Sequence, residues 1–384
     1  MEPVIVDAAR TPFGRRRGWL SHVHPAELLG LAQRGLLDRN ELPADRVEQL
    51  IGGCVTQAGE QAGNVTRNAW LHAGLPSPVG CTTIDAQCSS AQQSMHLIAG
   101  LIHADAIEVG LACGVESMSR LPLQSNMPGP TGRPKPEGWS IDLPNQFEGA
   151  DRIAREKGIT RAALDEFGLR SQRLAAEAWR AGHLTRQVIP VQPGEFGTPV
   201  EGTPEQVCTD QGLRDTDLER LAALDPVLTD GLHTAGTSSQ ISDGASAALL
   251  TSKAAAQRLG LRPRARIVSQ ALVGGDPHFH LDGPIQATER VLKRSGMSLS
   301  DIDLVEVNEA FAAVPLSLQR HFELPLDKLN TLGGAIAVGH PVGATGLRLV
   351  ATVLDELERR DLQRGLVAIC AGGAMASATI LERI

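Results

Sequence analysis

The sequence contains no tyrosine, and aromatic residues make up only 3 % of its 384 positions. The core must therefore be built from aliphatic side chains, chiefly Leu, Val, Ile and Ala. No apolar run reaches the ~18 residues that a membrane-spanning helix requires. The first residues lack the basic head and apolar segment of a signal peptide, so we expect a cytoplasmic protein with no membrane span.

Positive charge and paired cysteines are also scarce. The formal net charge is -8 and no long basic run occurs, which argues against a nucleic-acid partner. The six cysteines form no C-x-x-C pair, so neither a disulfide framework nor a zinc site is expected. Residues 22–24 and 278–280 each read His-x-His, but such isolated pairs are weak signals, and we predict no metal site.

The chain is longer than the ~250–300 residues at which a single core usually stops growing. Its C-terminal third repeats the order of its N-terminal third, with predicted strands at residues 4–6 and 265–271. Similar stretches of chain separate Val47 from Cys88 and Ile302 from His340, which indicates an internal duplication. Because strands alternate with helices, we expect sheets with parallel strands and helices on their faces.

The duplication predicts three parts. Residues 1–120 form a first half that is completed by about residues 240–262, and residues 263–384 form a second half. Residues 121–239 are predicted to be an inserted loop domain over the active site. Within this insertion, residues 121–133 are rich in Pro, Gly and Ser and predict a loop, whereas residues 151–181 predict a helix.

Residues 333–346 hold one histidine among five glycines. Glycines allow close approach of the backbone to a ligand, and Pro341 fixes the chain just after His340. From Thr345 onward, apolar residues recur at three- and four-residue steps and predict a helix. His340 is therefore expected on a rigid turn before a helix. The alternative is a structural histidine in a tight turn.

Cys88 is predicted at the start of a helix, where the partial positive charge of the helix N-terminus favours a thiolate. Cys370 ends a predicted strand before a glycine-rich turn, and the backbone N–H of Gly372 could stabilise an oxyanion. Asn308 follows another strand and could orient a donor. Taken singly, the two cysteines could be inert core residues, and Asn308 could cap a helix.

Two cysteines and a histidine at separate strand ends suggest a nucleophile, the base that activates it, and a second acid or base. This set suits Claisen chemistry, in which an acyl group moves while a carbanion forms or is quenched. Four segments of the sequence resemble the four active-site loops of the thiolase family. They are Cys88-Ser89-Ser90, Asn308-Glu309-Ala310-Phe311, Gly339-His340-Pro341 and Cys370-Ala371-Gly372-Gly373.

The resemblance covers essentially the whole chain and implies an α/β fold of duplicated βαβαβαββ halves, layered α-β-α-β-α. It implies a 3-ketoacyl-CoA thiolase, in which His340 activates Cys88 and Cys370 protonates the leaving acetyl-CoA carbanion. One oxyanion hole would use His340 with a water held by Asn308. The other oxyanion hole would use the backbone N–H groups of Cys88 and Gly372. Residues 52–57, 142–147 and 233–243 further resemble actinobacterial thiolases of steroid side-chain degradation.

The resemblance also implies acyl-CoA and CoA as partners, with CoA a co-substrate and no permanently bound cofactor. Arg214, Thr216, Ser239 and Gln146 are the candidate CoA contacts. Their alternatives are a solvated arginine and ordinary turn or loop residues. The family forms homodimers and homotetramers, and we expect one of these.

Two departures from the family pattern concern the acyl pocket. Ala374 replaces a common glycine after Cys370, and Ala91 replaces one after Cys88. Three other functions are alternatives. A ketoacyl synthase would lack the second cysteine, Cys370. A biosynthetic acetoacetyl-CoA thiolase is the second alternative, and the third is a non-catalytic acyl-CoA or sterol carrier, which would lack Cys88 or His340.

Overall fold

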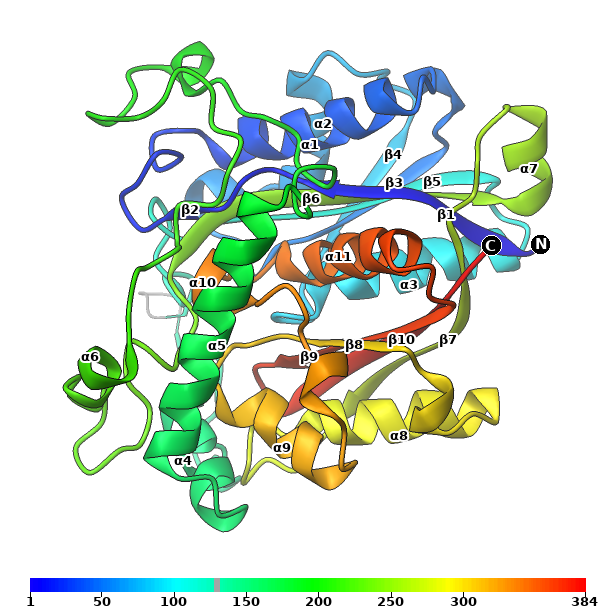
Figure 1. The fold of residues 1–384 in the computed structure, drawn as a ribbon. Coiled ribbons are helices and arrows are strands. Elements are labelled where there is room, and N and C mark those ends of the chain that lie inside the picture. Colours follow the sequence, from blue (N-terminus) through cyan, green and yellow to red (C-terminus); the bar gives the residue numbers. More distant parts are fainter. Residues whose placement is uncertain (128–131) are drawn as a thin grey trace.

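The computed structural model describes residues 1–127 and 132–384, and it consists of layers of helices and strands (Figure 1). The N-terminal half contains β1 (Pro3–Arg10), β2 (Gly14–Arg15), α1 (Pro25–Arg39), β3 (Gln49–Gly53), α2 (Val65–His72), β4 (Gly80–Ile84), α3 (Ser90–His103), β5 (Val109–Ser117), β6 (Ser242–Ser252) and α7 (Lys253–Arg258). The C-terminal half contains β7 (Ala265–Gly274), α8 (Gly283–Ser295), β8 (Leu304–Val307), α9 (Ala313–His321), α10 (Ala335–Val338), α11 (Thr345–Arg359), β9 (Arg364–Ala371) and β10 (Met375–Arg383).

The strands of the two halves follow the same order. Within the described residues they form a continuous path, β4-β3-β5-β6-β1-β7-β10-β9-β8. In the second half, a parallel bridge between Val305 and Leu329 takes the place of the β3–β4 pair. The halves meet where β1 pairs with β7 through Val4 and Ile5. The duplicated fold predicted from the sequence is thus confirmed.

Five layers are visible in Figure 1, because helices lie outside and between the two halves of the sheet. Helices α1 and α2 cover one outer face, and α8 and α9 cover the other. Helices α3 and α11 lie side by side in the middle layer. Every residue of α11 from Thr345 to Leu357 is buried, as expected for a helix enclosed on all sides.

The segment between β5 and β6 carries α4 (Gln146–Glu156), α5 (Arg161–Arg180) and α6 (Leu218–Ala222). The single helix predicted over residues 151–181 is wrong, since Gly158 adopts φ +64° and Thr160 caps a new helix by accepting from the N–H of Ala163. Helix α5 runs along one side of the layers (Figure 1). Residues 128–131 of the predicted loop lie outside the described residues, and the three-part division of the chain stays a prediction.

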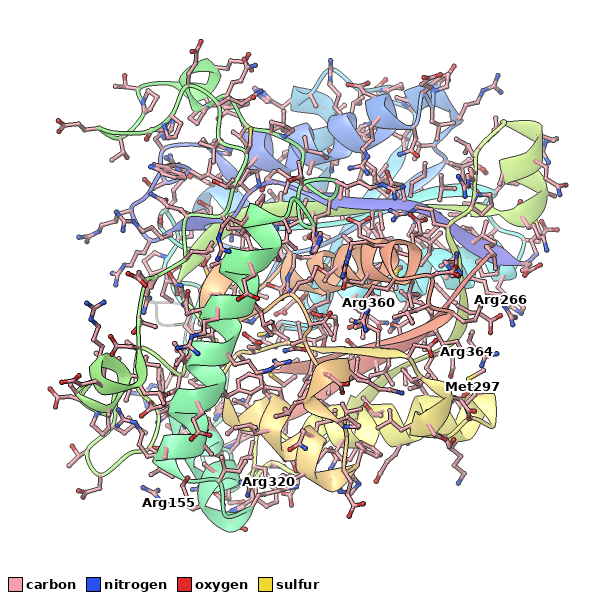
Figure 2. The ribbon with its side chains drawn as sticks, in the orientation of Figure 1. Arg155, Arg266, Met297, Arg320, Arg360 and Arg364 are labelled. Atoms are coloured by element: carbon pink, nitrogen blue, oxygen red, sulfur yellow. The ribbon has the colours of Figure 1, made fainter. Side chains whose placement is uncertain are left out.

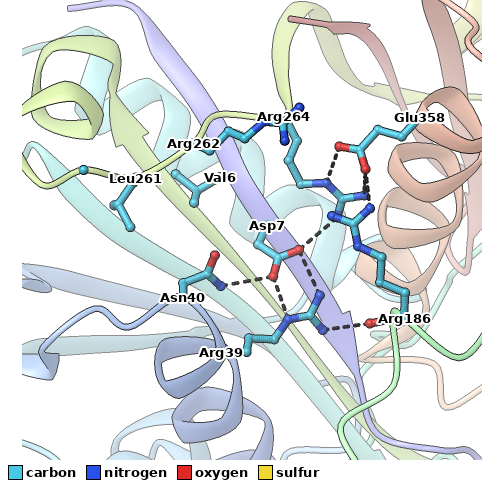
Figure 3. A pocket seen from close by; sticks show the side chains of 10 residues that line it. Val6, Asp7, Arg39, Asn40, Arg186, Leu261, Arg262, Arg264 and Glu358 are labelled. Carbon is cyan, nitrogen blue, oxygen red and sulfur yellow. Dashed lines mark hydrogen bonds and ion pairs between the residues drawn. The ribbon is translucent and has the colours of Figure 1, made fainter.

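Buried charge ties the two halves together at one end of the strands. The guanidinium of Arg264 contacts Asp7 of β1 at 2.9 Å, as Figure 3 shows. It also contacts Asp355 of α11 at 2.6 Å. A cavity of about 380 Å³ lies beside this cluster. The cavity adjoins the Ala265 end of β7. Cys370 lies at the opposite end of the sheet, where Gly274 of β7 pairs with Met375 of β10 and Met375 pairs with Ala371 of β9. This cavity is therefore distant from the predicted thiols.

At the surface, charge pairing is ordinary. Arg266 and Arg364, both labelled in Figure 2, pair with Glu382 of β10 at 2.6 and 2.7 Å. Both arginines are half-buried and share the largely buried carboxylate of Glu382. Among the described residues, no helix has the length and apolar character needed to cross a membrane.

Candidate active site

The predicted reactive residues meet where α3 and α11 begin. Cys88 precedes α3 and His340 precedes α11. At Gly346, an added Cβ would lie 2.5 Å from the backbone nitrogen of Gln92, so the first turns of the two helices touch. The packing of the two halves therefore brings the Cys88 and His340 segments together.

Cys88 is 6 % exposed. Burial raises the pKa of its thiol to about 12, and a backbone hydrogen bond from Gly372 works in the opposite direction. The sequence-based expectation of a stabilised thiolate is wrong for the unliganded site. Helix α3 begins only at Ser90, and desolvation is the largest influence on the pKa of the Cys88 thiol. Cys88 is thus a neutral thiol at pH 7.

Cys370 lies near the end of β9 and is fully buried. Burial raises the pKa of its thiol well above the ordinary value, and negative charge on Cys88 raises it further. The hydroxyl of Ser89 donates to the carbonyl of Ile369 at 3.4 Å, which links the two thiol-bearing segments. The site therefore holds two neighbouring thiols, both protonated at rest.

The imidazole of His340 is held in one tautomer. Its Nδ1 lies 2.6 Å from the hydroxyl of Thr345, which itself donates to the carbonyl of Pro341 at 3.0 Å. With the hydroxyl hydrogen directed at Pro341, Nδ1 carries the imidazole proton, and the contact of the Asn308 amide nitrogen with Nε2 fits this tautomer. Burial lowers the pKa of His340 to about 3. Its Nε2 therefore keeps its lone pair, which accepts a hydrogen bond from Nδ2 of Asn308 at 3.2 Å and is the basic position of the ring.

Asn308 faces this lone pair. Its backbone N–H donates to the carbonyl of Ala368 on β9 at 2.9 Å, and its Nδ2 lies 3.2 Å from Nε2 of His340. Its Oδ1 is buried and has no hydrogen-bond partner among the described residues. The arrangement places an unused amide oxygen beside the base.

Two glutamine side chains approach the α-carbon of Gly372 closely. A Cβ there would lie 2.8 Å from Oε1 of Gln87 and 3.5 Å from Nε2 of Gln146. The absence of a side chain leaves the Gly372 N–H directed at the Cys88 thiol. Gln146, one of the predicted CoA contacts, accordingly lies beside Gly372.

The other predicted CoA contacts lie elsewhere. Arg214 and Thr216 line a groove of about 280 Å³ along α5 together with Arg173 and Arg180. The Arg214 guanidinium donates to the carbonyl of Ala235 at 3.2 Å, and burial lowers its pKa. Ser239 donates its N–H to the carbonyl of Ala310, two residues beyond Asn308. Whether these four residues contact CoA stays a prediction.

Sequence reasoning missed several residues that support the site. Thr345 orients His340, and Ser242 accepts the His340 N–H at 3.1 Å. The buried carboxylate of Glu116 accepts from the N–H groups of Val55 and Gly343, so it connects the halves. A hydroxyl residue at the first position of the helix after His340 is a signal that could have identified Thr345.

Among the described residues, no group of three His, Cys, Asp or Glu side chains is arranged to hold a metal ion. The duplicated layers, with two thiols and an oriented imidazole at the junction of the halves, define an acyl-transfer class of α/β protein. The chain belongs to the thiolase family. The thiolase N-terminal domain matches residues 3–254, and the thiolase C-terminal domain matches residues 261–383.

Full-length relatives agree with this assignment. The chain is 41 % identical to a steroid 3-ketoacyl-CoA thiolase of Mycobacterium tuberculosis, covering 100 % of this chain and 94 % of the relative. It is also 41 % identical to a 3-ketoacyl-CoA thiolase of Saccharophagus degradans, covering 99 % and 98 %. The crystal structure of human mitochondrial 3-ketoacyl-CoA thiolase in complex with CoA matches with a TM-score of 0.90 and 32 % identity, covering 100 % and 98 %.

Proposed function

We propose that this protein is a 3-ketoacyl-CoA thiolase of β-oxidation that degrades lipid or steroid side chains. It cleaves a 3-oxoacyl-CoA with a second CoA, and gives acetyl-CoA and a shortened acyl-CoA. The observation that carries the proposal is the pair of buried, neutral thiols near an imidazole whose Nε2 is unprotonated and faces the amide of Asn308.

The first half of the reaction forms an acyl-enzyme. Nε2 of His340 takes the proton of Cys88 while the sulfur attacks the C3 carbonyl carbon. The C2–C3 bond then breaks, and its electron pair stays on C2 of the acetyl-CoA carbanion. The Cys370 thiol protonates C2, because its raised pKa keeps it protonated at neutral pH. This half ends with an imidazolium at His340 and a thiolate at Cys370.

The second half restores the site. The Cys370 thiolate takes the proton of an incoming CoA thiol, and the CoA sulfur attacks the Cys88 thioester. The shortened acyl-CoA leaves, and the Cys88 sulfur recovers its proton from the His340 imidazolium. Both halves balance in protons and charge without another reagent, so the three side chains suffice as acid and base.

Two sets of donors would stabilise the negative oxygen atoms. The N–H groups of Cys88 and Gly372 suit the oxygen of the tetrahedral intermediates formed at Cys88. His340 and Asn308 suit the thioester oxygen of the acetyl-CoA carbanion. The proposal includes CoA contacts at Arg214, Thr216, Ser239 and Gln146, together with a cytoplasmic homodimer or homotetramer.

The proposal of a steroid substrate is supported by the 41 % identity to the steroid 3-ketoacyl-CoA thiolase of Mycobacterium tuberculosis. The test is intact-protein mass spectrometry after mixing with a short 3-oxoacyl-CoA or with one carrying a steroid side chain, without free CoA. We expect an acyl mass gain that is absent in Cys88→Ala, and the faster-loading substrate identifies the preferred acyl group. Bound thioester without any adduct would instead support a carrier.

The biosynthetic alternative predicts the opposite direction. Incubation of the protein with acetyl-CoA alone should then give acetoacetyl-CoA faster than acetoacetyl-CoA is cleaved at matched concentrations. We expect cleavage to be faster for longer 3-oxoacyl-CoAs than for acetoacetyl-CoA, and the reverse order would favour biosynthesis.

A further inference from the structure

His280 occupies an unusual place beside the catalytic thiols. It lies in the turn between β7 and α8, is 7 % exposed, and adopts φ +60°. A non-glycine residue in this left-handed conformation is uncommon and persists only when its surroundings hold it there. In the sequence, this histidine belongs to the isolated His-x-His pair at residues 278–280.

Two hydrogen bonds fix the ring of His280 between two segments. The N–H of Gly373 donates to Nε2 at 3.0 Å, and Nδ1 lies 2.8 Å from the carbonyl oxygen of Pro144. An amide N–H can only donate and a carbonyl can only accept, so Nε2 must carry the lone pair and Nδ1 the proton. A single neutral tautomer satisfies both bonds, whereas a protonated ring would lose the bond to Gly373.

The surroundings favour that neutral form. Burial lowers the pKa of His280, and the positive charge of Lys135 acts in the same direction. Helix α4 approaches closely, since a Cβ on Gly149 would lie 2.9 Å from Cβ of His280. The imidazole is thus held between the backbone groups of Pro144 and Gly373, and the glycine at position 149 of α4 leaves space for the His280 side chain.

The bond to Gly373 matters because of the next residue. Gly372 directs its N–H at the Cys88 thiol, and Gly373 follows it with φ +76°. Ala374 follows with φ +57°, and its carbonyl accepts the N–H of Gly275 at 2.6 Å. Ala374 is therefore the strained residue of the turn after Cys370, and contacts from the β7–α8 turn hold this turn in place.

We propose that His280 is a positioning residue for acyl transfer, an inference that rests on the proposed thiolase function. By accepting the Gly373 N–H, it orients the preceding peptide so that the Gly372 N–H meets the oxyanion formed at Cys88. By donating to Pro144, it connects this donor to the segment that carries Gln146. The same contacts do not reach the His340–Asn308 pair, which serves acetyl-CoA carbanion formation.

Three variants separate the two hydrogen bonds. The amide oxygen of Gln reaches the position of the histidine Nε2, so His280→Gln keeps an acceptor for Gly373. The amide nitrogen of Asn matches the position of Nδ1, so His280→Asn keeps the donor to Pro144 but not the acceptor. His280→Ala removes both. Asn also tolerates the left-handed backbone, so His280→Asn is the variant least prone to misfolding.

We expect His280→Asn and His280→Ala to lower kcat for thiolysis by about 10- to 100-fold with a smaller change in KM, because a displaced oxyanion donor acts on the transition state. His280→Gln should retain activity within about 3-fold of the wild type. Deuterium exchange at C2 of acetyl-CoA, which uses Cys370 and the His340–Asn308 pair, should fall much less than thiolysis in every variant.

His278→Gln is the matched control. His278 lies on the same turn, is exposed, and contacts Asp142 and Glu156 rather than Gly373. It should leave both activities unchanged. Equal losses of thiolysis and exchange in His280→Asn, or equal thiolysis in the Asn and Gln variants, would overturn the positioning role. A wild-type protein without thiolysis would instead refute the proposed function itself, so the two failures are distinguishable.

Discussion

Removal of the Thr345 hydroxyl tests whether a fixed tautomer of His340 matters. In Thr345→Val the side chain keeps its shape, but Nδ1 of His340 loses its buried acceptor at 2.6 Å. The Pro341 carbonyl also loses the donor at 3.0 Å. One unsatisfied buried polar group costs about 1–3 kcal/mol, so the free energy of unfolding should fall by roughly that amount.

The kinetic effect is of similar size and has a separate origin. Without the threonine acceptor, the imidazole proton can move to Nε2, where it donates to the unused Oδ1 of Asn308 after an amide rotation. In that tautomer His340 cannot take the proton of Cys88. A preference of about 1.4–3 kcal/mol for the wrong tautomer lowers the rate about 10- to 150-fold.

Urea denaturation and the single-turnover rate of acyl-enzyme formation measure the two effects. Thr345→Ser, which keeps the hydroxyl, is the matched control and should remain near the wild type in rate. Equal acylation rates in the Val and Ser variants would show that Thr345 does not select the tautomer, even if both variants are less stable.

Three further predictions follow from the geometry. Gly346→Ala places a Cβ 2.5 Å from the Gln92 backbone and should cost about 1–3 kcal/mol in urea denaturation, whereas Gly100→Ala on α3 meets no atom within 4 Å and should be neutral or stabilising. Ala374→Gly should raise the free energy of unfolding by about 1 kcal/mol, because glycine adopts φ +57° without the steric strain that the alanine Cβ causes. A loss of stability would contradict this. Alkylation of Cys88 by iodoacetamide should rise about tenfold per pH unit from pH 7 to 10, because its thiol has a pKa of about 12; a plateau near pH 7 would indicate a resting thiolate.

The duplicated fold was predictable because its signals are local and occur twice. Strand patterns near Val4 and Ala265, and glycine-rich or polar helix starts near Cys88 and His340, recur in the same order. The break between α4 and α5 was missed because the apolar periodicity runs through it. Gly158 follows the end of α4 and Thr160 caps the start of α5, but both residue types are also tolerated inside helices at a modest cost in stability.

The candidate site was predictable to the extent that its motifs are contiguous. Cys88, Asn308, His340 and Cys370 each stand in a short segment with a recognisable pattern. The role of His280 depends on Gly373 and Pro144, which are far away in the chain, so no local pattern indicates it. The direction of the Cys88 pKa was predicted wrongly because the cost of burial depends on tertiary packing rather than on the position along a helix.

The neutral resting state follows from the same burial and suits the proposed chemistry. A thiolate beside Cys370 would compete with the substrate carbanion for the same donors and raise the pKa of Cys370 further. With the pKa of His340 at about 3 and that of Cys88 at about 12, little charge exists until the substrate carbonyl arrives. Charge then develops where the Gly372 N–H already points, so the donor need not reorient during the reaction.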